Sequence, residues 1–305
     1  MYYFIVNPKS CSGKGLKIWK KIEDELQKEN IQYQVCFTEK QGHAARLSAE
    51  ISTGHSPCTI VAVGGDGTAN EVIDGLLNYD SIKFGYIPTG SGNDLARGLS
   101  LPARPKAALD AILHPRQIRN INVGSAVLSD RTHHFIVSSG MGFDAAVCHE
   151  AMHSKIKNAL NRVGLGKLTY LGIALKQLLL LHPASMKLTL DDDQTLLFEH
   201  TFFAAVMNLK YEGGGFMFCP EADAEDSCLD ICLVEKMPKL KILFLLPTAF
   251  SGRHIKYKGI HILRCRHATI ETDSPLILHT DGESKNYQTK VFFSITKEQL
   301  PFIVG

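Results

Sequence analysis

The 305-residue chain lacks most of the features that mark membrane-spanning, secreted or nucleic-acid-binding proteins. No stretch approaches the roughly 18–20 consecutive apolar residues that a bilayer span requires. The opening MYYFIVNPKS has neither the basic segment nor the long apolar stretch of a signal peptide. The formal net charge is only +2, whereas binding through phosphate neutralisation needs a clustered basic excess. We therefore expect no transmembrane segment and no nucleic-acid partner.

Cysteine pairs with metal-binding or redox spacing are also absent. The eight cysteines are scattered, and none forms a Cys-x-x-Cys pair. Cys228 and Cys232 are best interpreted as ordinary thiols near a strand. Disulfides and a zinc site are poor predictions for such a chain, so a reduced, cytoplasmic location is expected.

The first 120 residues or so alternate strand-like and helix-like segments. In 68–77, for example, apolar residues recur at i, i+3, i+4, i+7 and i+8, which is typical of an amphipathic helix. Repeated β–α units of this length predict a parallel sheet covered by helices on both faces. The expected strands are 2–8, 33–37, 58–63 and 83–88, and the expected helices are 14–28, 43–53, 68–77 and 91–99.

The pattern changes near residue 117, after which strand-like stretches prevail. Alternation is clear in MKLTL, residues 186–190. We therefore predict an α/β chain of two domains: 1–120, and a mostly antiparallel β domain over 121–297 with a helical insertion at roughly 152–181. The expected strands of the second domain are 118–128, 133–139, 186–198, 200–208, 229–235, 268–280 and 290–296.

A glycine-rich turn follows the third expected strand. Gly64, Gly65 and Gly67 permit positive φ and leave backbone N–H groups uncovered. A helix that starts near Thr68 would point its free N–H groups and its positive dipole end at the same place, an arrangement that binds phosphate. Asp66 would repel a bare phosphate, but a Mg²⁺ ion or a sugar hydroxyl between them removes that objection. The turn is neither a Walker A loop nor a dinucleotide fingerprint.

A purely structural interpretation of this turn stays open. Thr68-x-x-Glu71 is a capping box, in which each residue satisfies a free backbone N–H at the start of a helix. That motif alone would account for both side chains without any ligand.

Two further polar turns end neighbouring strands. Thr89 begins the Thr-Gly-Ser-Gly-Asn-Asp turn that ends with Asn93 and Asp94, although either of these two could simply cap the next helix. Asn7 ends the first strand and precedes a Ser/Gly/Lys turn. Three such turns in successive β–α units would line one edge of the sheet, where ligands bind in open α/β folds.

An ordered set of motifs resembles the soluble diacylglycerol kinase-like family of lipid kinases. That family includes bacterial diacylglycerol and phosphatidylglycerol kinases and, more distantly, sphingosine and ceramide kinases. The resemblance spans nearly the whole chain. The motifs that carry it are NPKSCSGKG (7–15), TEKQGHA (38–44), GGDGTANEV (64–72), PTGSGNDLAR (88–97), GMGFDAAV (140–147), GKLTY (166–170), GGGFMFCPEADAEDSCLDICLV (213–234) and DGE (281–283).

This resemblance implies a kinase that uses ATP and Mg²⁺ to phosphorylate a lipid hydroxyl, most simply that of diacylglycerol. It implies a Rossmann-like nucleotide-binding domain, a β-sandwich domain, an active site in the cleft between them, and a tail at about 298–305 that returns to the first domain. The lipid acceptor implies peripheral contact with the inner face of the membrane, and the sequence leaves a homodimer open.

The resemblance also implies roles for individual residues. Glu283 matches the family's general base. Asp226 matches a structural Mg²⁺ ligand, with the backbone carbonyls of Asp223 and Cys228 beside it. Ser227 stands where the family usually has glycine, and a side chain at this turn would weaken or reshape the metal loop. The positions that match nucleotide contacts are Asn7, Thr38, Gly64, Gly65, Asp66, Gly67, Thr68, Asn70, Glu71 and Thr89.

Phosphoryl transfer depends mainly on positioning and charge neutralisation. A carboxylate at Glu283 can take the proton of an acceptor alcohol. Asp66 and Asp281 are candidates for holding the catalytic Mg²⁺, directly or through water. Asp281-Gly282 is equally a common hairpin pair, and the acidic run around Asp226 is equally an ordinary solvated loop.

Three alternatives are compatible with the sequence. The basic stretch 253–267 could face anionic headgroups or protect a sheet edge from aggregation. NAD kinases also carry Gly-Gly-Asp-Gly-Thr, but here Asn70 and Glu71 follow it immediately, and the separate Asn-Glu/Asp segment of NAD kinases is missing. A regulatory protein that binds nucleotide without kinase activity is a further alternative.

Overall fold

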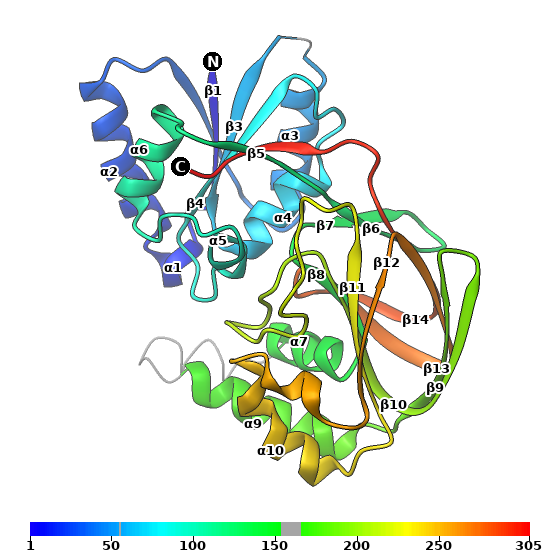
Figure 1. Ribbon diagram of the computed structural model, residues 1–305. Coiled ribbons are helices and arrows are strands. Elements are labelled where there is room, and N and C mark those ends of the chain that lie inside the picture. The colour runs from blue at the N-terminus through cyan, green and yellow to red at the C-terminus, as the bar shows by residue number, and fades with distance from the viewer. Residues whose placement is uncertain (55, 154–165) are drawn as a thin grey trace. The chain divides into compact units, whose positions relative to one another are not determined.

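The computed structural model describes residues 1–54, 56–153 and 166–305, and these divide into two units (Figure 1). Unit 1 contains Met1–Val123 together with Thr296–Gly305, and unit 2 contains Gly124–Ile295. Among the described residues, no helix combines the length and the apolar character needed to cross a bilayer.

Unit 1 is built on a six-stranded sheet in the order β2-β1-β3-β4-β15-β5. All neighbouring pairs are parallel except β15 with β5. The strands are β1 (Tyr2–Val6), β2 (Tyr33–Phe37), β3 (Cys58–Gly64), β4 (Ile82–Pro88), β5 (Ile118–Ile121) and β15 (Leu300–Ile303). The helices are α1 (Ser10–Gly13), α2 (Gly15–Lys28), α3 (His43–Ser52), α4 (Asp66–Asp74), α5 (Asp94–Gly98) and α6 (Pro105–Leu113).

Helices cover both faces of this sheet, as the β–α alternation predicts (Figure 1). Helices α2 and α6 pack together on one face, and α3 and α4 pack together on the other. Trp19 of α2 is 1% exposed, and its ring centroid lies 5.3 Å from that of Phe4 on β1. Burial of such large rings is a main source of stability for this layer.

The C-terminal strand β15 lies within the sheet of unit 1. It pairs in parallel with β4, opposing Phe302 to Phe84, and antiparallel with β5, opposing Leu300 to Ile121. The rings of Phe84 and Phe302 lie 5.1 Å apart in an edge-on arrangement. The chain thus leaves unit 1 after β5 and returns to pair beside that strand.

Unit 2 contains a nine-stranded antiparallel sheet in the order β12-β11-β10-β8-β13-β14-β6-β7, and β9 bridges β10 and β13. The strands are β6 (Gly124–Val127), β7 (Thr132–Phe135), β8 (Ser138–Gly142), β9 (Ala184–Leu190), β10 (Gln194–Met207), β11 (Leu229–Glu235), β12 (Ile260–Cys265), β13 (His267–Thr280) and β14 (Glu283–Ile295). The helices are α7 (Phe143–His153), α9 (Gly166–Leu180), α10 (Lys239–Ala249) and the short 3₁₀ helix η1 (Arg253–Lys256).

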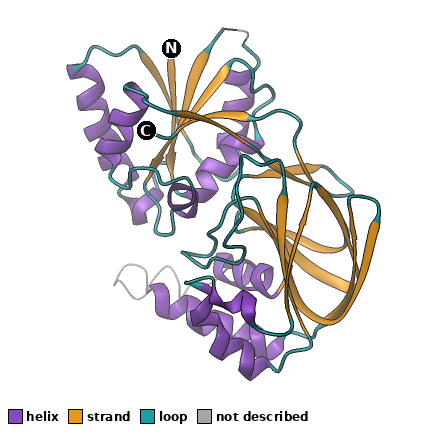
Figure 2. Cartoon of the chain, in the orientation of Figure 1, coloured by secondary structure: helices purple, strands orange, loops and turns teal. Residues whose placement is uncertain are grey.

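Strand β10 separates two cores of unit 2. Ala204 and Val206 face the core enclosed by the sheet, whereas Phe203, Ala205 and Met207 face a second core beneath the helices. This alternation follows from the two-residue period of a strand. The helices of unit 2 gather on one side of the sheet (Figure 2).

The structure corrects several expected elements. The stretch 118–128 forms two strands, β5 and β6, which belong to different units. The stretch 186–198 is a hairpin, because Asp191 and Asp192 turn with φ of 49° and 63°. Helices α6 and α10 were not expected, and Pro247 lies inside α10. Residues 154–165 of the expected helical insertion lie outside the described part of the chain.

Candidate active site

The three polar turns of unit 1 meet at the carboxyl ends of β1, β3 and β4. The Asn7 side-chain amide donates to Thr68 Oγ1 at 3.1 Å. Thr89 Oγ1 donates to Ser10 Oγ at 2.8 Å, and the Thr89 backbone N–H donates to the Gly64 carbonyl at 2.7 Å. Side chains of one turn therefore hold the next, and we call this group of residues 7–15, 64–68 and 89–95 the turn cluster.

Two of the glycines in the turn cluster are required by close packing. A Cβ at Gly90 would lie 2.8 Å from the Gly65 Cα, and a Cβ at Gly64 would lie 2.4 Å from the Thr68 side chain. Backbone therefore packs directly against backbone between two of the turns. Glycine at such a position lets a phosphate come close to the backbone N–H groups of a turn.

Asp66 joins the first glycine turn to the turn after β4. Its carboxylate accepts from the backbone N–H of Asp94 at 3.0 Å and of Leu95 at 3.2 Å, so the first residue of α4 satisfies the start of α5. Asn93 makes no side-chain cap there; its amide donates to the Gly90 carbonyl instead. Burial, and then the nearby Asp94 carboxylate, raise the pKa of Asp66.

The capping-box interpretation is wrong. Helix α4 begins at Asp66, and its N-cap is Gly65, which has no side chain that could accept a hydrogen bond from the helix start. Thr68 accepts from Asn7, and the Glu71 carboxylate accepts from the Ala44 N–H at 3.3 Å in the first turn of α3. These side chains therefore tie α4 to other elements.

The remaining nucleotide-contact candidates lie close to the turn cluster. The Thr38 backbone N–H donates to the Val6 carbonyl at 2.9 Å, which places Thr38 beside the end of β1. Asn70 is 2% exposed in the first half of α4.

The Asp66 and Asp94 carboxylates converge. A Cβ at Gly92 would lie 3.3 Å from Asp66 Oδ2 and 3.7 Å from Asp94 Oδ2, so both oxygens approach one point. Arg97 forms an ion pair with Asp94. Two carboxylate oxygens that share a partly buried position are a donor set that fits Mg²⁺. Asp94, expected only as a helix cap, thereby joins Asp66 as a candidate magnesium ligand.

In unit 2, the Asp-Gly-Glu motif forms a two-residue hairpin between β13 and β14. Asp281 and Gly282 have φ of 46° and 81°, as a type I′ turn requires. The Asp281 carboxylate accepts from three backbone N–H groups at 2.8–2.9 Å, those of Ile136, Val137 and Ser138. We therefore assign Asp281 the task of anchoring the turn.

Glu283 opens β14 directly after this turn. Its side chain is 18% exposed, and its Oε2 lies 3.3 Å from the ammonium nitrogen of Lys285, a side chain that is 12% exposed. The ion pair restrains a carboxylate that solvent still reaches. Such a group can accept a proton from an alcohol placed beside it.

A buried cluster of Asp144, Glu212 and His279 lies directly behind the turn. His279 is fully buried, and its Nε2 lies 3.1 Å from Asp144 Oδ2 and 3.2 Å from Glu212 Oε1. These residue types can hold a metal ion. Sequence reasoning missed all three residues, although each lies within two residues of a motif of the family resemblance.

In the predicted metal loop, the Asp226 carboxylate contacts other residues of the protein. The Asp226 carboxylate accepts from the Cys228 N–H at 2.9 Å and forms an ion pair with Arg264. The Asp226 N–H donates to the Asp223 carbonyl at 3.4 Å. Ser227 adopts a φ of 59°, the conformation that favours the glycine usual in the family. A metal ligand at Asp226 therefore stays a prediction.

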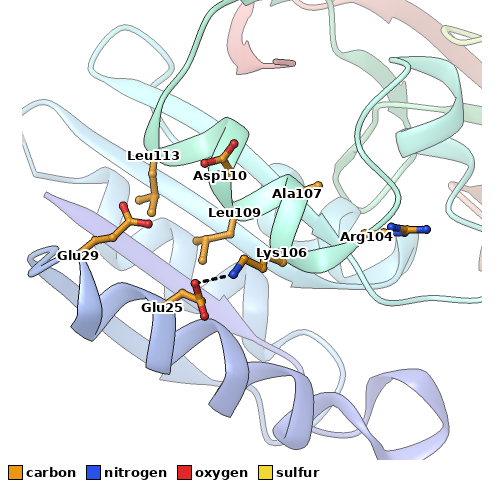
Figure 3. A pocket seen from close by; sticks show the side chains of 8 residues that line it. All are labelled: Glu25, Glu29, Arg104, Lys106, Ala107, Leu109, Asp110 and Leu113. Atoms are coloured by element: carbon orange, nitrogen blue, oxygen red, sulfur yellow. Dashed lines mark hydrogen bonds and ion pairs between the residues drawn. The ribbon is translucent and has the colours of Figure 1, made fainter.

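A pocket of about 340 Å³ in unit 1 does not contain any of the predicted site residues. It lies between α2 and α6, where Lys106 and Glu25 form an ion pair at 2.9 Å (Figure 3). Helix-layer residues line it: Glu25, Glu29, Arg104, Lys106, Ala107, Leu109, Asp110 and Leu113.

Two family models match most of this chain. A family model of the diacylglycerol kinase catalytic domain matches residues 1–126, and a model of the YegS C-terminal NAD kinase beta sandwich-like domain matches residues 136–300. A Bacillus subtilis (strain 168) protein named "Putative lipid kinase YtlR" is 32% identical over 92% of this chain and 93% of its own length. A diacylglycerol kinase of Mycobacterium tuberculosis (strain ATCC 25618 / H37Rv) is 30% identical over 79% of this chain and 75% of its own length.

Solved structures share the fold. A crystal structure of a diacylglycerol kinase from Bacillus anthracis str. Sterne matches with a TM-score of 0.73 and 21% identity, covering 100% of this chain and 96% of that one. An NAD kinase from Archaeoglobus fulgidus in complex with ATP matches with a TM-score of 0.53 and 14% identity, covering 99% of this chain and 93% of that one. The resemblance and the two-domain fold expected from the sequence are both confirmed. This chain belongs to the family of lipid kinases that share the diacylglycerol kinase catalytic domain.

Proposed function

We propose that this protein is an ATP-dependent lipid kinase that transfers the γ-phosphate to a lipid hydroxyl, most simply that of diacylglycerol, giving phosphatidic acid. The observation that carries the proposal is the turn cluster, in which hydrogen bonds tie three glycine-containing strand ends together at the start of α4. Backbone N–H groups at a helix start bind phosphate. Such donors suit the phosphates of a nucleotide. The names of the relatives suggest a lipid acceptor.

Several residues of this chain have proposed roles. The nucleotide, with Mg²⁺, supplies the phosphoryl group and the charge neutralisation. Asp66 and Asp94 would hold the metal, since their oxygens approach one point. Glu283 would take the proton of the acceptor hydroxyl. Asp281 fixes the turn that presents Glu283, and the proposal requires that this turn reach the bound nucleotide.

An exposed apolar surface on unit 2 supports contact with a membrane. Five large side chains of α9, α10 and the following turn are more than half exposed: Leu179, Leu180, Leu240, Phe244 and Phe250. Lys239 ties the two helices, since its ammonium group donates to the Leu179 carbonyl at 2.7 Å. Apolar side chains beside lysine favour an interface with anionic lipid.

The basic stretch 253–267 has two parts, and each part fits a different one of the two expected roles, contact with anionic headgroups and protection of a sheet edge. Arg253 and Lys256 belong to η1, which packs against α10 near the apolar surface. Arg264 belongs to β12, the strand at one edge of the sheet, and pairs with Asp226. The first part supports membrane contact, and the second part is a charged sheet edge.

The first experiment measures transfer from γ-labelled ATP to detergent-dispersed lipids, with Mg²⁺ and with a chelator. The panel holds diacylglycerol, monoacylglycerol, phosphatidylglycerol, ceramide and a sphingoid base, with NAD as a non-lipid acceptor. We expect label on one lipid only, and only with Mg²⁺. Label on NAD would make this chain a NAD kinase-like enzyme. No label, with nucleotide binding confirmed in parallel, would favour a regulatory protein.

The membrane contact has its own test. Phe244→Ser should reduce co-sedimentation with vesicles that contain anionic phospholipid, because it removes a 72%-exposed ring from the apolar surface. Leu197→Ser is the matched control, since Leu197 is 77% exposed on β10. Equal loss in both variants would contradict the assignment of this surface.

A further inference from the structure

Three separate motifs supply the buried cluster behind the Asp281-Gly282 turn. Asp144 comes from the first turn of α7, Glu212 from the loop after β10, and His279 from β13. The loop reverses sharply, because three consecutive glycines, residues 213–215, all have positive φ. Gly140 makes room, since a Cβ there would lie 2.1 Å from Asp144 Oδ2 and 3.0 Å from His279 Nε2. Two carboxylates from distant parts of the sequence thus contact the same nitrogen of one histidine ring.

The hydrogen bond at the far side of the ring shows where the ring carries its proton. The Gly282 backbone N–H donates to His279 Nδ1 at 3.1 Å, and this contact requires that Nδ1 carry no proton. Burial favours the neutral ring, whereas Glu212, Cys148 and Asp144 raise the pKa of His279 well above its usual range. The hydrogen bond decides between them, because a second proton on Nδ1 would point at the Gly282 N–H. The neutral ring then carries its proton on Nε2, which faces the Asp144 and Glu212 carboxylates at 3.1 Å and 3.2 Å. Each nitrogen has a partner of the right kind in this tautomer.

The same hydrogen bond argues against a metal ion on His279. A histidine that binds metal through Nε2 donates a proton from Nδ1 to an acceptor. Here that proton would point at the Gly282 N–H, and two donors would face each other. The cluster has metal-binding residue types but the wrong partner for a metal-bound ring.

The two carboxyl groups can share a proton instead. Asp144 Oδ1 and Glu212 Oε2 are buried, and neither oxygen has a hydrogen-bond partner in the described part of the chain. Burial raises the pKa of Glu212, and the Asp144 carboxylate raises it further, whereas His279 opposes both. A proton on Glu212 would supply a donor for these oxygens. Cys148 is the other titratable group that faces the ring.

We propose that His279 is a positioning residue that orients the Gly282 amide and, through it, the Glu283 carboxylate. The proposal rests on the proposed function of Glu283 as the base. Asp281 holds one side of the turn through residues 136–138, and His279 holds the other side through Gly282. Asp144 and Glu212 fix the tautomer that leaves Nδ1 free to accept.

The first test reads the ring itself and needs no activity. Long-range ¹H–¹⁵N correlation spectra of the full chain with labelled histidine should show His279 protonated on Nε2 only, and titration with Mg²⁺, Mn²⁺ or Zn²⁺ should leave its shifts unchanged. A ring protonated on Nδ1, or a ring whose shifts move with metal, would overturn the proposal whether or not the protein is a lipid kinase.

The second test separates the two sides of the ring. His279→Asn places a carbonyl near the Nδ1 position and can still accept from Gly282, whereas His279→Gln places its amide near the Nε2 position and cannot. We expect His279→Gln to lower kcat by about 10- to 100-fold, the usual effect of a displaced catalytic group, with KM for ATP unchanged. His279→Asn should lose far less and keep the Gly282 amide shift.

A second buried histidine of unit 2 provides the control for a general loss of stability. His254 is 3% exposed and bonds the Phe218 carbonyl, away from the turn. His254→Gln should keep kcat. Equal kcat losses in the two His279 variants that follow their loss of stability would show a structural role only and overturn the proposal. If neither variant folds, the spectra of the unaltered chain decide.

Discussion

The two units hold their candidate functional residues in different ways. In unit 1, glycine turns pack backbone against backbone, and neutral side chains such as Asn7 and Thr89 tie the turns together. In unit 2, buried ionisable side chains hold a single hairpin turn. Backbone donors need only a local sequence pattern, whereas a buried charge needs partners from distant segments. The glycine turns of unit 1 can therefore be predicted from the sequence, whereas the buried cluster of unit 2 cannot.

The largest expected effect comes from the one side chain of unit 2 with a proposed chemical step. Glu283→Ala should lower turnover by ~10²–10⁴-fold, the usual contribution of a general base, and should leave ATP binding near normal. Steady-state kinetics and nucleotide titration measure the two effects. Glu298→Ala, another glutamate near the C-terminus, is the control. Unchanged turnover in Glu283→Ala would remove this residue from the mechanism.

A substitution in the turn cluster of unit 1 should instead weaken the binding of ATP. In Gly90→Ala the new Cβ would lie 2.8 Å from the Gly65 Cα, so one of the two turns must move. We expect ATP affinity to fall on the order of 10- to 100-fold, because small displacements at such sites are costly. Gly54→Ala is the matched control, since its Cβ would make an ordinary 3.4 Å contact. Equal affinity for ATP in both variants would contradict the phosphate-binding role.

A smaller effect tests whether the Asp226 loop holds a metal or only an ion pair. Asp226→Ala should reduce activity and its dependence on Mg²⁺ if the carboxylate is a ligand. Arg264→Ala should change stability by only about 0–1 kcal/mol, because the Arg264 side chain is 48% exposed. Activity at graded Mg²⁺ concentrations separates the two variants. Indistinguishable Mg²⁺ profiles would favour the ion pair alone.

The smallest effect concerns the pH dependence of stability, which the buried groups of unit 2 should control. Burial lowers the pKa of His254, against the opposing hydrogen bond with the Phe218 carbonyl. Below a pH of about 6.5 the unfolded chain takes up a proton that the folded chain resists, so stability falls as pH decreases through this window. The loss is about 1.4 kcal/mol for each unit by which the pKa is lowered.

His254→Gln removes this titration. Urea unfolding at several pH values should therefore show a flatter dependence below about pH 6.5 in the variant than in the unaltered chain. Parallel curves for the two proteins would show that His254 does not contribute.

Within unit 1, local pattern was enough to predict most of the elements. Helix α2 and strand β2 lie within a residue of their expected bounds, because amphipathic spacing and apolar runs mark them clearly. The start of α4 was misplaced by two residues, since Thr68-x-x-Glu71 satisfies a capping pattern but bonds to Asn7 and Ala44 instead. The side-chain partners of a helix end are chosen by packing, which local sequence does not contain.

The sequence by itself determined the order of the β–α units, the glycine turns at the strand ends and the family. The tertiary structure alone decided that β15 lies beside β4, that Asp281 binds the N–H groups of 136–138, and that Asp144, Glu212 and His279 share one buried site. Asp144 and His279 are 135 positions apart. Contacts of that separation depend on which strands pair and in which register, and register is set by the whole core rather than by any one segment.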